Sequence, residues 1–203
     1  MQARMAARMI RRDFLKRAAL APAAVLGARL SFAADALGRR PARVGAVVFD
    51  ERYSDCRIFA DALAREGAVA FATGGNSANV WYGPLRAHLA RYGGAVAGLT
   101  TDSDFVVSRG CGRELGLEMI FEGAHDCRES TRAVHRLASR AGDAREIAAT
   151  LGVPSLYWAE SLAVALQGIS RRNTVRGLTT AELTTLRSGD HPGYLASWLL
   201  DSV

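Results

Sequence analysis

The stretch Val44–Phe49, VGAVVF, followed at once by Asp50, decides the fold. Six consecutive small or apolar residues bounded by polar ones are typical of a strand buried on both faces, as in a parallel sheet. The next segment predicts a helix over residues 54–66, because its apolar residues recur at helical spacing until Gly67 ends the pattern. The folded part of the chain therefore begins with a strand followed by a helix.

The same unit repeats further along the chain. Strands are predicted over residues 68–72, 95–99 and 117–121, and helices over residues 81–92 and from Ser103 or Asp104 to residue 115. Strands and helices that alternate in this way are typical of βαβ units, whose connections are right-handed and whose strands are parallel. The sequence predicts an α/β fold with an open parallel sheet of at least four strands, flavodoxin- or Rossmann-like in outline.

The texture of the sequence changes after Cys127. Residues 128–151 are charged, Ala-rich and helically spaced, so they predict a helix, and a second helix is predicted to begin at Pro154. Residues 179–187 open with a capping-box spacing and predict a short helix, and residues 194–200 predict a last apolar one. A fifth strand around residues 154–157 stays an alternative. We expect residues 43–203 to form a single domain with a mainly helical C-terminal part.

The front of the chain has the three parts of an export leader. Basic residues are followed by an apolar segment over residues 18–28 and then by small residues that predict cleavage after Ala33, with Ala34 as the alternative. The pair Arg11 and Arg12, followed by Asp13, Phe14 and Leu15, resembles the twin-arginine (Tat) export signal of bacteria. That resemblance implies that residues 1–33 are a signal peptide and that the Tat translocase carries the folded protein to the periplasm. The polar, Pro-containing residues 38–41 indicate a linker over residues 34–42.

The leader also explains the basic character of the chain. It holds seven of the 26 basic residues and one of the 20 acidic residues, so the remaining chain has 19 of each and a net charge near zero. Binding of nucleic acid is therefore not expected, since it needs a surplus of cations. We also expect no transmembrane segment in the mature chain, because no later apolar run reaches the roughly 20 residues that a bilayer requires.

Polar residues follow each predicted strand. In open α/β sheets ligands bind beyond the carboxyl ends of the strands, so these turns predict a crevice in which Asp50 and Asp102 share one pocket. Such residues are also the ones that cap helices and form turns, so a purely structural role stays open. The predicted ligand-binding residues are Asp50, Thr73, Asn76, Thr101 and Asp102. Residues 75–82, with Trp81 and Tyr82, are predicted to face a ligand or partner.

No motif in the sequence names a reaction or a cofactor. The chain lacks a dinucleotide fingerprint, a phosphate loop and a nucleophile elbow. His125, Asp126 and Cys127 are potential ligands, but adjacent residues rarely hold one metal ion and no metal site is predicted. His88 and His135 are expected on solvated helix surfaces. The cysteines Cys56, Cys111 and Cys127 leave two alternatives: a Cys111–Cys127 bridge, or three buried thiols.

Two functions are compatible with these observations. The first is a periplasmic accessory or partner protein, exported folded, that serves a cofactor-containing oxidoreductase. The second is a small periplasmic enzyme or ligand-binding protein that uses the crevice at the strand ends. The Tat-like leader and the lack of a recognisable catalytic set favour the first.

Overall fold

The computed structural model describes residues 44–129, 131–140, 144–153, 157–169, 178–186 and 193–202. The predicted signal peptide, its cleavage site, its twin arginines and the linker lie outside the described residues. So does most of the alternative strand around residues 154–157.

Seven strands form one sheet in the order β2-β1-β3-β7-β4-β5-β6. Strands β1, β2 and β3 are mutually parallel, and β7 pairs antiparallel with both β3 and β4. Strands β5 and β6 extend the sheet by further antiparallel pairing. The strands are β1 (Val44–Phe49), β2 (Val69–Ala72), β3 (Ala95–Thr100), β4 (Leu117–Asp126), β5 (Arg132–Ser139), β6 (Thr179–Leu186) and β7 (Tyr194–Ser202).

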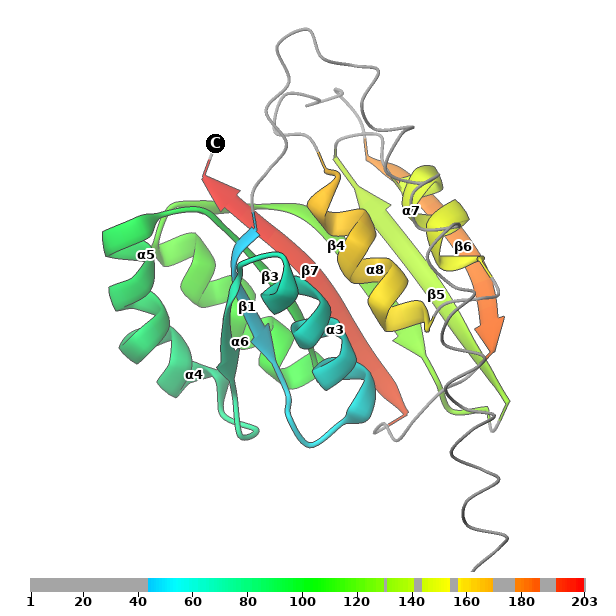
Figure 1. The fold of residues 1–203 in the computed structure, drawn as a ribbon, viewed down its shortest axis with the longest axis horizontal. Helices are drawn as coiled ribbons and strands as arrows, with labels where there is room; N and C mark the ends of the chain where they lie inside the picture. Colours follow the sequence, from blue (N-terminus) through cyan, green and yellow to red (C-terminus); the bar gives the residue numbers. More distant parts are fainter. Residues whose placement is uncertain are drawn as a thin grey trace, which may run out of the picture. The chain divides into compact units, whose positions relative to one another are not determined.

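Helices cover the sheet on both sides (Figure 1). On one face α3, α7 and α8 enclose the larger apolar core, with Phe59 and Leu162 at its centre. On the other face α4, the π-helical turn η2, α5 and α6 enclose a smaller core around Trp81 and Trp198. The helices are α3 (Ser54–Arg65), α4 (Ser77–Val80), η2 (Trp81–Leu85), α5 (Arg86–Tyr92), α6 (Asp102–Glu114), α7 (Ala144–Leu151) and α8 (Trp158–Gln167).

Strand β1 matches its prediction. Val47 and Val48 are both fully buried, and they belong to the cores on opposite faces of the sheet. The strand lies between β2 and β3. Its continuous apolar sequence is therefore explained by burial on both faces.

The prediction of an α/β fold is confirmed, but the parallel sheet is smaller than expected. Three strands are hydrogen-bonded in parallel, and the fourth predicted strand, β4, pairs with β7 and β5 instead. Two antiparallel steps separate β4 from β3, so β1 to β4 still run in one direction. The sequence analysis does not predict that strand β7 lies between β3 and β4. The sheet is mixed.

Three predicted helices are wrong in whole or in part. Residues 132–139, 179–186 and 194–202 form strands, and of the described part of the predicted 128–151 helix only Ala144–Leu151 is helical. In β5 the buried positions alternate with exposed ones, which is the period of a strand. In β7 nearly every residue is buried, so no periodicity distinguishes a strand from a buried helix.

Among the described residues, no helix is both long enough and apolar enough to cross a bilayer.

Candidate functional site

The carboxyl ends of the three parallel strands meet at one edge of the sheet. Phe49 at the end of β1 is in register with Ala72 of β2 and with Leu99 of β3. The first and third strands are therefore neighbours in the sheet. The turns that follow these strands form the carboxyl edge, defined here by residues 50–55, 73–77 and 101–104.

Asp50 is one of three buried acidic residues at the carboxyl edge, with Asp55 and Asp104. The Asp50 side chain is fully buried. The Arg52 guanidinium group forms a bidentate ion pair with it: Nε lies 2.8 Å from Oδ1 and Nη2 lies 2.6 Å from Oδ2. The backbone N–H of Arg52 donates to the same carboxylate at 3.1 Å. Hydrogen bonding to Asp50, reinforced by its charge, raises the pKa of Arg52. Both carboxylate oxygens are thus used within the turn.

Asp104, on the first turn of α6, ties the second and third turns together. Its carboxylate accepts from the backbone N–H of Ser77 at 3.1 Å and from the hydroxyl of Thr73 at 3.4 Å. The Ser77 hydroxyl donates to the Asp104 carbonyl at 3.3 Å. Thr101 caps α6 by accepting from the Asp104 N–H. The Gly74 N–H donates to Glu51 at 2.9 Å, which joins the first turn to the second.

The five predicted ligand-binding residues therefore share one edge but have different environments. Asp50 and Thr73 are buried and engaged by neighbours, and Thr101 is a half-buried cap. Asn76 and Asp102 are exposed. The shared pocket of Asp50 and Asp102 stays a prediction.

The segment predicted to face a partner divides between core and surface. Trp81 is buried, and its indole N–H donates to the Ser108 hydroxyl at 2.9 Å. Tyr82 is 57% exposed and reaches Glu114 with an oxygen–oxygen distance of 3.1 Å. Hydrogen bonding to Cys111, the larger cause, and hydrogen bonding to Glu114 both raise the pKa of Tyr82. Trp81 thus holds the segment against α6, and Gly75, Asn76, Asn79 and Tyr82 are its exposed residues.

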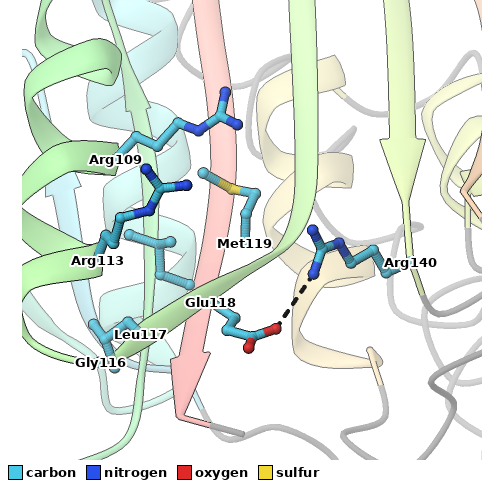
Figure 2. A pocket seen from close by; sticks show the side chains of 8 residues that line it. Arg109, Arg113, Gly116, Leu117, Glu118, Met119 and Arg140 are labelled. Carbon is cyan, nitrogen blue, oxygen red and sulfur yellow. Dashed lines mark hydrogen bonds and ion pairs between the residues drawn. The ribbon is translucent and has the colours of Figure 1, made fainter.

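A cavity of about 370 Å³ lies at the opposite edge of the sheet, between α6 and the start of β4 (Figure 2). Arg109 and Arg113 extend over it from α6, and Arg140, just after β5, reaches toward it from the other side. We call this cavity the arginine cleft. Its remaining lining residues are Gly116, Leu117, Glu118, Met119 and Leu200.

Charge is unevenly balanced in the arginine cleft. Arg140 pairs with Glu118 at 3.3 Å. The side chains of Arg109 and Arg113 form neither a hydrogen bond nor an ion pair with any residue that the structure describes. Three guanidinium groups and one carboxylate leave two uncompensated positive charges. The sequence does not predict that these charged residues lie together, because they come from a helix, the start of one strand and the end of another.

Two histidines that the sequence analysis placed elsewhere lie buried on the sheet. His135 was expected on a solvated helix; it is fully buried on β5, opposite His125 of β4. The two Nδ1 atoms lie 2.7 Å apart, and the Nε2 atoms lie 2.7 Å from the Ser197 and Thr185 hydroxyls. Trp158 of α8 packs against both rings.

These four side chains form a hydrogen-bonded row across β7, β4, β5 and β6, which we call the histidine row. Between the two Nδ1 atoms one ring must donate and the other accept, so the accepting imidazole is neutral and carries its proton on Nε2. Desolvation lowers the pKa of His125 well below its ordinary value, and lowers that of His135 to about 4. His88, the other predicted surface histidine, is half-buried against Phe71 and Tyr92.

The three cysteines are buried thiols. None of them forms a disulfide, so the alternative of a Cys111–Cys127 bridge is wrong in this structure. Burial raises the pKa of the Cys56 thiol. Within the described residues no three His, Cys, Asp or Glu side chains group as metal ligands.

Comparison of the chain with models of protein families, with curated proteins and with solved structures found no match. Its function is therefore inferred from its own residues.

Proposed function

We propose that this chain is a Tat-exported periplasmic accessory or partner protein that serves a cofactor-containing oxidoreductase. The observation that carries the proposal is the leader, in which Arg11 and Arg12 precede Phe14 and Leu15. The Tat pathway that this motif resembles carries folded cargo, and such cargo often holds a cofactor or travels with a partner.

The chemistry of the carboxyl edge favours a binding role over catalysis there. A general acid or base must reach a substrate proton. Arg52 donates hydrogen bonds to both carboxylate oxygens of Asp50. The Asp104 carboxylate accepts hydrogen bonds from the Thr73 hydroxyl and the Ser77 N–H. These contacts brace three turns and give the edge a fixed surface, as a partner-binding face requires.

Export is tested by the double substitution Arg11→Lys and Arg12→Lys in the precursor. We expect the precursor to accumulate in the cytoplasm, because a Tat-like signal depends on the arginine pair. Fractionation and immunoblotting measure the periplasmic yield. The matched control is Arg4→Lys with Arg8→Lys, which preserves charge equally outside the pair and should be exported. Normal periplasmic yield from the first variant would reject export by this route.

The accessory role is tested by isolating the exported protein from the periplasm with its partners. Recovery of a redox enzyme in stoichiometric amount supports the proposal. A lone monomer carrying a metabolite supports the alternative, a small periplasmic enzyme or ligand-binding protein that uses the strand ends. That alternative draws on the flavodoxin- or Rossmann-like outline expected for the parallel strands and on Asn76 and Asp102, which are exposed at that edge.

A further inference from the structure

In the arginine cleft, the side chains of Arg109 and Arg113 have no acidic partner among the residues that the structure describes. Arg109 and Arg113 lie one helical turn apart on α6, and like charges at that spacing destabilise a helix. Glu118 is the one acidic residue lining the cleft, and its partner is Arg140. Both members of that pair are exposed, so their interaction is weak and is easily exchanged for another. An anion placed among the three arginines would relieve this repulsion.

We propose that the arginine cleft binds a small phosphate monoester. The lining carries two surplus positive charges, and a phosphate monoester carries close to two negative charges at neutral pH. Guanidinium groups bind phosphate oxygens through paired hydrogen bonds, and two of them here are free to do so. This site is independent of the export proposal.

The rest of the cleft indicates that the ligand has an apolar body. Leu117, Met119 and Leu200 line the cavity beside the arginines. The volume of about 370 Å³ lies within the range of sites that hold small molecules. An apolar group attached to the phosphate would cover the half-buried side chains of Leu117 and Met119, so an organic phosphate should bind more tightly than inorganic phosphate.

The test is a titration of the full chain, labelled with ¹⁵N, with phenyl phosphate, inorganic phosphate and phenol. A site-resolved measurement is needed because the leader is also basic. We expect phenyl phosphate to shift the amide signals of Gly116, Leu117 and Glu118, with a dissociation constant on the order of 0.1–1 mM. Inorganic phosphate should bind severalfold more weakly, and phenol should leave these signals unchanged.

Two variants assign the binding to the arginines. In Arg109→Gln/Arg113→Gln the affinity for phenyl phosphate should fall at least about tenfold, as expected for the loss of charge-assisted hydrogen bonds. The matched control is Arg86→Gln/Arg145→Gln, which removes two exposed arginines from α5 and α7 and should leave the affinity unchanged. Thermal unfolding of each variant confirms that it is folded.

Glu118→Gln gives a prediction of opposite sign. Removing this carboxylate raises the surplus charge and releases Arg140, so phenyl phosphate should bind several times more tightly. A purely structural role for the Glu118–Arg140 pair would give weaker binding or none. The proposal is overturned if phenyl phosphate shifts no signal at the cleft, if the control loses affinity equally, or if Glu118→Gln weakens binding.

Discussion

At the residue scale, one glycine determines how β3 and β7 can meet. A Cβ atom at Gly98 would lie 2.1 Å from the indole ring of Trp198, the residue opposite it in the register. Trp198 is fully buried and packs against Trp81, with ring centroids 6.1 Å apart. The indole thus occupies the space that a side chain on β3 would fill.

We therefore expect Gly98→Ala to destabilise the protein by about 1–3 kcal/mol, the usual cost of overpacking a core. Denaturant unfolding measures the difference. Gly110→Ala is the control, because a Cβ there meets no atom within 4 Å and alanine favours a helix. The control should be stabilised by about 0.5–1 kcal/mol. Equal effects of the two substitutions would mean that Trp198 is not packed against β3.

Strand β1 allows a second comparison of buried and exposed positions. Val48→Ala should cost about 1–3 kcal/mol, because it removes buried aliphatic surface and leaves a cavity. Val69 of the edge strand β2 is 44% exposed, so Val69→Ala should cost much less. Chemical denaturation of both variants tests this. An unchanged midpoint for Val48→Ala would contradict burial of β1 on both faces.

At the scale of elements, the histidine row links four strands and makes the stability of the folded protein depend on pH. Both imidazoles are neutral in the folded protein, and their pKa values are lowered by burial, for His135 to about 4. In the unfolded chain a histidine titrates near 6.5. As the pH falls below 6.5, these histidines bind protons in the unfolded chain but stay unprotonated in the folded protein. The free energy of unfolding therefore decreases.

We expect each buried histidine to lower the free energy of unfolding by about 1.4 kcal/mol per pH unit between pH 6.5 and about 4. Denaturant titrations across this range measure the slope. His135→Gln should remove one histidine's share of it. The control is His88→Gln, at a half-buried site outside the row. This variant should retain the full pH slope that His125 and His135 contribute together. A slope unchanged by His135→Gln would show that His135 is protonated when folded.

Elements differ in how far the sequence could predict them. The elements of residues 44–115 are predictable because each strand is an apolar run and each helix shows its own periodicity. In β6, TTAELTTL combines strand alternation with a capping-box spacing, so the local sequence is compatible with both a strand and a helix. The carboxyl edge was predictable because parallel strands end together. The arginine cleft was not, since it depends on the antiparallel half of the sheet.

At the scale of the whole molecule, the last strand lies inside the sheet. Strand β7 separates the parallel group β2-β1-β3 from the group β4-β5-β6 and pairs with both along its length. Among the described residues, neither group of strands is hydrogen-bonded to the other without it. The seven-stranded sheet can therefore form only after residues 194–202 have been synthesised.

Removal of residues 193–203 should therefore abolish cooperative folding instead of merely lowering stability. The truncated chain would leave β3 and β4 with open edges and would expose the cores that Trp198 and Leu199 fill on the two faces. Circular dichroism during thermal unfolding tests this, with a chain lacking only Val203 as the control. A single sharp transition in the truncated chain would show that the two strand groups fold without β7. If the Tat proposal is right, the truncated precursor should also fail to reach the periplasm, while the control is exported.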